Sequence, residues 1–335
     1  MIHSPYIHKP ASVQRVMLTV LLALTPGIAA YVWQVGAGIL VNLTIATVTA
    51  VLAEALVLKL RGRPVGTAVA DLSAIVTAWL VVLCFPPIVP WWLTMVAVLI
   101  AIVAVKHLYG GLGQNPFNPA MVAYCAMIVA YPSLMSQWPP AGGLDFDTQL
   151  ALILGGARDL DAITGATALD AMRTGMRATG ATVDAVLQAD AFGQFGGRGW
   201  EWLAVGYLAG GLFLLARGVI TWHMPLAFLT ALAGIAGAFW IASPTQFASP
   251  LFHLASGGAM LAAFFIVTDP VTGATTPRGK LLFAAGVGVL AYLIRAFGAF
   301  PEGIAFAVLL MNMCVPLIDM KTQPRVFGQG RGRQI

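Results

Sequence analysis

A short polar stretch, Asp161-Ala162-Ile163-Thr164-Gly165-Ala166-Thr167, stands out in an otherwise apolar sequence because its residues could hold an anion. A helix-forming run over 168–173 follows it, and Thr164 or Thr167 is placed to cap the start of that helix. The small residues between the two threonines let a bulky phosphate-bearing group approach the backbone, and helix N-termini favour anions. A capped surface helix explains the same residues, so both interpretations stay open at this point.

The pattern Asp-x-x-Thr-Gly-Ala-Thr of this stretch recurs at 269–275. The second copy is followed by Arg278 and Lys280, whereas the first copy lies in a long acidic connection. If the two copies lie on opposite sides of a membrane, an enzyme outside the cytoplasm can modify only the first. A turn with helix caps explains the second copy equally well.

A third unusual stretch is Gly110-Gly111-Leu112-Gly113-Gln114-Asn115-Pro116-Phe117-Asn118-Pro119. Its two Asn-Pro pairs and three glycines break helical structure. Non-helical backbone at a membrane boundary is tolerated only where protein or a polar cavity covers it. The stretch is therefore either a helix-breaking turn capped by asparagine or one wall of a small-molecule pocket. In such a pocket, Asn115 and Asn118 would donate and accept hydrogen bonds.

The composition indicates a protein built for lipid. Of the 335 residues, 59% are hydrophobic and 9% are charged, and the mean hydropathy is +0.86. A soluble domain carries about 25% charged residues. The net charge of +5 does not indicate nucleic-acid binding, because the basic residues lie scattered between apolar runs. The chain is therefore expected to contact membrane lipid and no nucleic acid.

The apolar runs predict an all-α integral membrane protein with about ten transmembrane helices. Each run is close to the roughly 20 residues that a spanning helix needs. They lie near 16–35, 38–58, 67–85, 91–107, 119–138, 200–217, 222–242, 250–268, 281–297 and 303–320.

Basic residues set the orientation of these spans. They precede the first run and follow the second, fourth, sixth, eighth and tenth runs, so ten spans place them all on one side. That side is expected to be the cytoplasm, with both termini on it. Four parts follow: a membrane half over 1–138, an extracytoplasmic insertion over 139–199, a second membrane half over 200–320 and a cytoplasmic tail over 321–335.

The insertion over 139–199 is the exception to otherwise short connections. It holds seven Asp against four Arg, and its pattern predicts short helices near 147–156, 166–177 and 181–189. Connections longer than about 15 residues are usually functional or disordered. The helical pattern favours a folded and functional insertion.

Other polar or reactive residues give weaker indications. Glu54 and Asp71 lie near predicted span ends and are candidates for cation or proton contacts, although a position near the interface also explains them. The cysteines, Cys84, Cys125 and Cys314, are far apart in apolar runs. Their spacing does not suit a metal site, so a structural role is expected.

Taken together, these motifs resemble one known family: the D subunit of the Rnf electron-transport complex, related to the B subunit of the sodium-pumping NADH:quinone reductase. The resemblance spans nearly the whole chain. It is strongest over 115–120, over 161–167 and from Phe264 to Asp319, which includes Pro301-Glu302-Gly303. The short polar N-terminus fits the Rnf subunit better than its relative.

The resemblance implies a flavin protein. In that family, a flavin transferase attaches FMN by a phosphoester to the last threonine of a Ser/Thr-Gly-Ala-Thr motif, and the matching residue is Thr167. Asp161, Thr164, Gly165 and Ala166 complete the motif, with Thr164 where many relatives have serine. The second copy is a full motif ending at Thr275, which is expected to stay unmodified. The relatives also suggest a second, non-covalent flavin, riboflavin or FMN, near Asn115 and Asn118.

The resemblance further implies an electron-carrier subunit without its own catalytic residues or metal. In the family, electrons move between ferredoxin and NADH while Na⁺ or H⁺ crosses the bacterial inner membrane, and the flavin loop faces the periplasm. Partners would be Rnf subunits of the A, B, C, E and G types. A ten-helix secondary transporter or channel without a redox cofactor is the alternative, because broken helices also form transporter sites.

Overall fold

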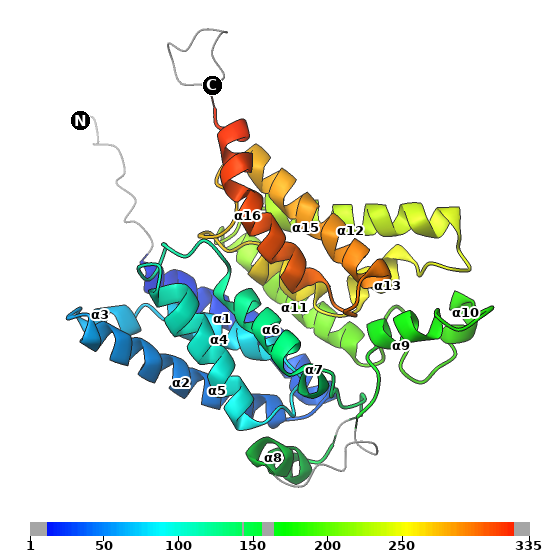
Figure 1. The fold of residues 1–335 in the computed structure, drawn as a ribbon, viewed down its shortest axis with the longest axis horizontal. Helices are drawn as coiled ribbons and strands as arrows, with labels where there is room; N and C mark the ends of the chain where they lie inside the picture. The colour runs from blue at the N-terminus through cyan, green and yellow to red at the C-terminus, as the bar shows by residue number, and fades with distance from the viewer. Residues whose placement is uncertain (1–11, 143, 156–163, 325–335) are drawn as a thin grey trace, which may run out of the picture.

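The protein is a bundle of helices, seen here in a computed structural model that describes residues 12–142, 144–155 and 164–324. Within those ranges there is no β-strand, only two isolated bridges. Figure 1 shows the helices before residue 139 on one side of the molecule and those after residue 199 on the other. The elements are α1 (Val13–Gln34), α2 (Gly38–Leu60), α3 (Val65–Val69), α4 (Ser73–Leu83), α5 (Trp91–Leu99), η1 (Ile100–His107), α6 (Pro119–Ala130), α7 (Pro132–Met135), α8 (Phe146–Leu154), α9 (Ala168–Gly175), α10 (Val183–Val186), α11 (Trp200–Ala216), α12 (His223–Ala242), α13 (Pro250–Ala255), α14 (Ala259–Leu261), η3 (Ala262–Ile266), α15 (Pro277–Phe297) and α16 (Ile304–Thr322).

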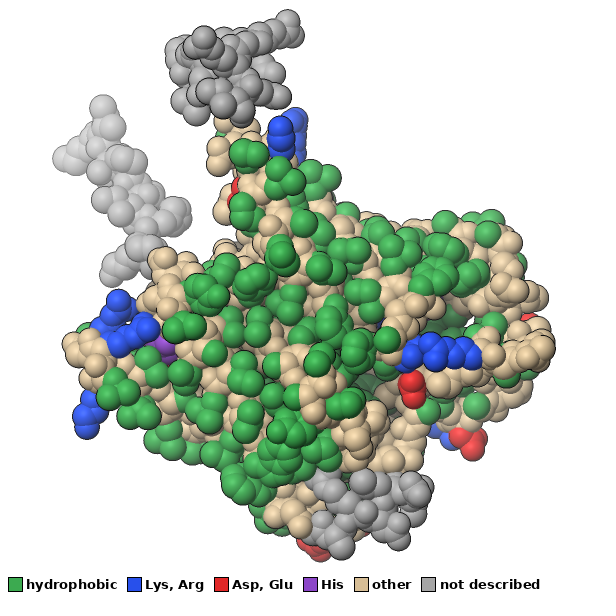
Figure 2. All heavy atoms as spheres, viewed as in Figure 1, with side chains coloured by type: hydrophobic (Ala, Val, Ile, Leu, Met, Phe, Trp, Pro, Cys, Tyr) green, Lys and Arg blue, Asp and Glu red, His purple; other side chains and the backbone are tan. Residues whose placement is uncertain are grey.

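Five of the described helices are long and apolar enough to cross a membrane: α1, α2, α12, α15 and α16. Four shorter apolar helical stretches accompany them, at 73–83, 91–107, 119–130 and 200–216. Figure 2 shows apolar side chains across the middle of one face, with charged side chains mostly at its margins. The chain is therefore a multi-pass, helical membrane protein, and the count of ten spans and their orientation stay predictions.

Three of the predicted spans are shorter or interrupted. The one near 67–85 holds a continuous helix only from Ser73, because Leu72 has φ +64° and breaks the chain after α3. The one near 119–138 ends at Ala130, since Pro132 disfavours a helical conformation at the residue before it. The one near 250–268 is broken over 256–258, where Gly257 has φ +63°. Both membrane halves thus contain interrupted helices.

Helices α1 and α11 join the two halves at short range. Gly206 and Gly210 of α11 lie directly against the α1 backbone, at Gly27 and Ala23. A side chain at either glycine would collide with that backbone, so the small residues permit the close approach that is common between membrane helices. Gly27 in turn accommodates the ring of Tyr207. This packing fixes where Tyr207 lies.

The insertion is folded where the structure describes it. Three helices, α8, α9 and α10, match the predicted positions. Asp145 caps α8, accepting hydrogen bonds from the hydroxyl and backbone N–H of Thr148, and these bonds lower the pKa of its carboxyl. Helices α9 and α10 share a small apolar core with the region before α13, formed by Ala168, Leu169, Met172, Val183, Phe192, Ala248 and Phe252. The insertion is therefore held against the second membrane half.

Candidate functional site

A cavity of about 470 Å³ opens where the insertion meets both membrane halves, and Thr167 is part of its wall. Residues of α1, α4, α6, α9, α11, α14 and α16 line it. Pockets of about 300–1,000 Å³ with mainly apolar walls and a few polar groups are typical of small-molecule sites. We call this the Thr167 cavity.

Thr167 is the residue that caps α9. Its backbone is extended, and its hydroxyl accepts a hydrogen bond from the backbone N–H of Asp170 at 3.3 Å. The preceding Gly165 donates its N–H to the carbonyl of Trp138 at 2.9 Å, which ties the motif to the end of the first half. Thr164 is also part of the described chain, while Asp161 lies outside the described residues. The choice between the two threonines as the cap is thereby resolved in favour of Thr167.

Two more residues of α9 reach the same cavity, Asp170 and Arg173. Together with Thr167 they are spaced by three residues, which places them along one face of the helix. Arg173 lies 3.9 Å from the Asp170 carboxylate, and its Nε is buried without a hydrogen-bond partner among the described residues. A guanidinium with one unpaired N–H group therefore lies within two turns of the Thr167 hydroxyl.

The cavity wall is rich in aromatic rings. Tyr31 and Trp138 each meet Trp200 edge to face, with ring centroids 5.8 and 5.1 Å apart. Tyr124 and Phe300 also line the cavity. Such a lining suits a flat, conjugated ligand, because aromatic faces and edges pack favourably against one.

Three hydroxyl groups of the wall are buried without a hydrogen-bond partner in the described part of the chain: those of Tyr31, Tyr207 and Ser256. The three side chains come from α1, from α11 and from the break between α13 and α14. A buried polar group left unpaired costs about 1–3 kcal/mol.

A buried ion pair supports one wall of the cavity. The Arg295 guanidinium donates to both carboxylate oxygens of Glu302, at 3.1 and 2.9 Å, and to the carbonyls of His253 and Ser256 at 2.8 and 3.5 Å. Glu302 also accepts the N–H of Gly258 at 3.0 Å. The pair therefore satisfies the backbone groups that the break in this segment leaves free. Glu302 itself lines the cavity.

A second cavity, of about 400 Å³, contains both asparagines of the Asn-Pro stretch, and we call it the Asn118 cavity. The Asn118 side chain caps α6, accepting from the N–H groups of Ala120 and Met121 at 3.0 and 3.2 Å. Its amide nitrogen lies 3.5 Å from both the Ile266 carbonyl and the Asp269 carboxylate. Asn115 donates to the Phe117 carbonyl at 3.0 Å. The stretch is therefore both a turn capped by asparagine and part of the wall of a pocket.

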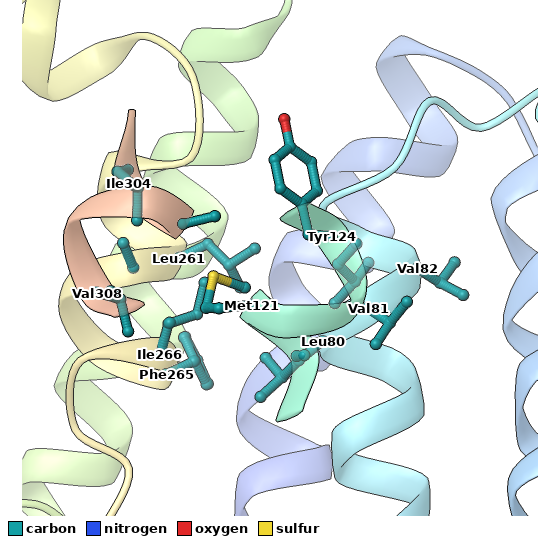
Figure 3. Close-up of a cluster of buried hydrophobic side chains, with 14 of the residues drawn as sticks. Leu80, Val81, Val82, Met121, Tyr124, Leu261, Phe265, Ile266, Ile304 and Val308 are labelled. Carbon is teal, nitrogen blue, oxygen red and sulfur yellow. The ribbon is translucent and has the colours of Figure 1, made fainter. Parts of the chain in front are cut away.

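An apolar layer separates the two cavities. Adjacent residues of one helix line opposite cavities: Ala120 and Met121 of α6, and Phe265 and Ile266 of η3. Figure 3 shows Met121, Leu261, Phe265 and Ile266 meeting between the halves. The two cavities are thus placed one behind the other along the boundary between the halves.

The repeated motif ends at the Asn118 cavity. The Thr275 backbone N–H and hydroxyl both donate to the Asp319 carboxylate, each at 3.0 Å, and the hydroxyls of Thr276 and Thr322 lie 2.6 Å apart. Thr275 is therefore next to the last turns of α16, while the Thr167 cavity includes Ile304 at its first turn. The 19 residues of α16 span about 28 Å. The two copies lie at opposite ends of that helix.

Glu54 and Asp71 belong to a buried polar cluster. Lys106 donates to Glu54 at 2.6 Å and to Ser73 at 2.7 Å, and Ser73 donates to Asp71. His107 lies 3.3 Å from the Glu54 carboxylate. Glu54 is 2% exposed, and Lys106 is its counter-charge. A role of Glu54 and Asp71 in cation or proton contacts stays a prediction.

Five residues in the wall of the Thr167 cavity were not predicted as site residues from the sequence: Tyr31, Tyr124, Tyr207, Ser256 and Glu302. The three tyrosines lie within apolar runs, where a hydroxyl group needs a hydrogen-bond partner. That need is the signal in the sequence that could have identified them. The three cysteines are free thiols, with Cys84 and Cys125 half-buried and Cys314 exposed, and Cys84 also lines the cavity.

Comparison with known proteins gives a consistent result. The family model described as NQR2, RnfD, RnfE matches residues 1–328. A protein of Yersinia pseudotuberculosis serotype I (strain IP32953) is 46% identical over 99% of both chains. Proteins of Aliivibrio salmonicida (strain LFI1238) and Escherichia coli (strain SE11) are each 46% identical over 98% of both chains. All three relatives are named as the D subunit of an ion-translocating oxidoreductase complex.

These matches cover almost the whole length, and they confirm the resemblance drawn from the motifs. By sequence, the chain belongs to the NQR2, RnfD, RnfE family.

Proposed function

We propose that Thr167 carries FMN through a phosphoester bond and that the Thr167 cavity holds the flavin. The observation that carries this proposal is the position of Thr167 in the wall of a large aromatic-lined cavity, at the N-terminus of α9. The residues present fit the group. Arg173 and the N-terminal end of α9 suit a phosphate, and the aromatic rings and polar side chains of the wall suit a flat, conjugated ring that carries polar atoms.

Attachment is a transfer reaction with a flavin dinucleotide as donor. The Thr167 oxygen forms a bond to the phosphorus next to the riboflavin part, the pyrophosphate bond breaks, and the nucleoside monophosphate leaves. The hydroxyl proton is released to the solvent or to the transferase. The motif keeps only small side chains before Thr167, so the enzyme can reach the hydroxyl.

When bound, the flavin supplies the redox chemistry, and this chain supplies position and electrostatics. The Thr167 bond would retain the cofactor, Trp138 and Trp200 would pack against it, and the apolar wall would exclude water. The Arg295–Glu302 pair keeps the broken segment of the wall in place.

We propose further that the chain is the flavin-carrying subunit of an Rnf-type complex in the bacterial inner membrane, with the flavin loop in the periplasm. The names of its relatives, as subunits of an ion-translocating oxidoreductase complex, support this assignment. The complex would transfer electrons between ferredoxin and NADH and move Na⁺ or H⁺. Its other members would be of the A, B, C, E and G types, with a flavin transferase acting during maturation.

Mass spectrometry of the purified complex tests the attachment. Trypsin cleaves after Arg158 and Arg173, so Thr167 lies in the peptide 159–173. We expect that peptide to carry one added FMN phosphoryl group, and fragmentation to place the group on Thr167. An unmodified peptide from an active complex matured with its transferase would favour the transporter alternative.

Replacing the threonine that ends the second motif copy is expected to have no effect on covalent flavin. Thr275→Ala should leave covalent flavin fluorescence unchanged on a denaturing gel, because Thr275 lies at the other end of α16 and its hydroxyl is held by Asp319. The measurement is fluorescence per unit of stained protein, compared with the unaltered chain. A loss of fluorescence would show that the orientation is inverted or that the attachment residue is Thr275.

We propose that the Asn118 cavity holds a second, non-covalent flavin, with Asn115 and Asn118 in its wall. Asn115→Ala should raise the Kd of the flavin about ten-fold, since one lost hydrogen bond weakens binding by about that factor, and should thereby lower the flavin released by acid precipitation. Gln114→Ala is the matched control, because Gln114 is exposed and outside the cavity wall. Equal release from both variants would remove the support for this site.

A further inference from the structure

We propose that Lys106 and Asp71 are positioning residues of the Asn118 cavity, which fix the face of α4 that forms part of its wall. The inference rests on the proposed second flavin, because that flavin is the ligand whose binding this face would support. It assigns a function to the buried polar cluster around Lys106, which the attachment of FMN to Thr167 does not need.

One face of α4 lines the Asn118 cavity. Its lining residues are spaced by three or four positions, which places them along one side of the helix: Ser73, Val76, Thr77 and Leu80. Ser73 is the first residue of α4, and it is 5% exposed. The groups that hold Ser73 therefore set the position of this face relative to the cavity.

Two charged side chains from different elements hold Ser73. Lys106, in the last turn of η1, donates to the Ser73 hydroxyl at 2.7 Å, and that hydroxyl donates to the Asp71 carboxylate. The same carboxylate accepts the Ser73 backbone N–H at 2.7 Å. Glu54 accepts a second hydrogen bond from Lys106 at 2.6 Å, so the ammonium group is fixed between α2 and α4. Hydrogen bonds to charged groups are stronger than those between neutral groups, which makes these contacts effective restraints.

The backbone before Ser73 does not fix the start of α4 by itself. Leu72 has φ +64°, a left-handed conformation that is unfavourable for a residue other than glycine. Such a conformation persists only where the surrounding structure holds it. The hydrogen bonds that Asp71 and Lys106 make with Ser73 supply that support. Without either residue, the first turn of α4 is expected to shift.

The Thr167 cavity is supported in a similar way. Arg295, in the last turn of α15, donates to the carbonyl of Ser256 in the break between α13 and α14, and it pairs with Glu302. In each membrane half, a buried cation near the end of one helix therefore holds a break in another helix. Residues at each break line one of the two cavities. The recurrence indicates that Lys106 serves the Asn118 cavity as Arg295 serves the Thr167 cavity.

The test measures binding of riboflavin and of FMN to the full chain in detergent, coexpressed with the flavin transferase and stripped of dissociable flavin. Asp71→Ala and Lys106→Met should each raise the Kd from fluorescence titration about ten-fold, the equivalent of one lost hydrogen bond in the wall. Covalent flavin per chain on a denaturing gel should stay unchanged. Asp71 lies outside the cavity wall, so its effect must pass through the position of α4.

Asp145→Ala is the matched control. Asp145 accepts the backbone N–H and the hydroxyl of Thr148 at the start of α8, as Asp71 does for Ser73, but neither residue lines a cavity. The Kd of this variant should equal that of the unaltered chain.

A double variant separates position from charge. Lys106→Met combined with Glu54→Gln leaves no unpaired carboxylate at residue 54, yet methionine cannot hold Ser73, so the Kd should stay raised. A return of the Kd to that of the unaltered chain would show that Lys106 only neutralises Glu54, and the inference would be wrong.

An unchanged Kd in either single variant would overturn the inference. So would a parallel loss of covalent flavin, because that pattern indicates a general loss of folding and not a change at one cavity. Failure of the unaltered chain to bind riboflavin or FMN is a different result: it would reject the proposed second flavin itself.

Discussion

Thr167→Ala should abolish covalent flavin on the chain and, with it, electron transfer through the assembled complex. The substitution removes the only atom through which the phosphoester can form. The expected loss of gel fluorescence is complete, while the loss of folding stability is about 1 kcal/mol, since the α9 cap is removed. A complete loss of fluorescence with so small a loss of stability would show that the variant lacks the attachment residue and is not misfolded.

Thr167→Ser provides the matched control. Serine keeps both the hydroxyl for the phosphoester and the acceptor for the Asp170 N–H, so fluorescence and activity should persist. The measurements are in-gel fluorescence and ferredoxin-dependent NAD⁺ reduction in membranes. Full activity of Thr167→Ala in a complex matured with its transferase would reject the role assigned to this threonine.

The cap of α9 at Thr167 and the helices of the insertion could be predicted from the sequence because their signals are local. Thr167 precedes a helix-forming run and follows small residues, and short-range capping decides where α9 begins. The apolar runs likewise predicted a helical membrane protein, since roughly 20 apolar residues are needed to span lipid. These features do not depend on distant parts of the chain.

The walls of the two cavities could not be predicted because they depend on packing between distant segments. Tyr31 and Tyr207 are 176 residues apart, and the glycines of α11 bring their helices together. The break at Gly257 is also held by tertiary contacts. Around Gly257 the break is stabilised by Arg295 and Glu302, which lie about 40 residues further along the chain.

Arg295 is the residue whose loss should most damage the folded structure. Arg295→Leu would leave the Glu302 carboxylate without its counter-charge and two carbonyls of the broken segment without a donor. The Arg295 side chain is 1% exposed and the Glu302 side chain is 21% exposed, so water can replace the hydrogen bonds of the carboxylate only in part. Breaking a buried ion pair by removing one partner costs about 3–5 kcal/mol. Glu302→Leu on the same background should recover part of that loss, because it removes the unpaired charge.

The measurement is the free energy of unfolding of the detergent-solubilised chain. Arg217→Leu is the control, since Arg217 is an exposed arginine at the end of α11 and should change stability by less than about 1 kcal/mol. Equal effects of the two substitutions would contradict the role of the pair.

Because Ser256 and Glu302 line the Thr167 cavity, Arg295→Leu should also reduce covalent flavin per chain. The stability of this wall and the loading of the cofactor are thus expected to fall together, which a purely peripheral ion pair would not produce.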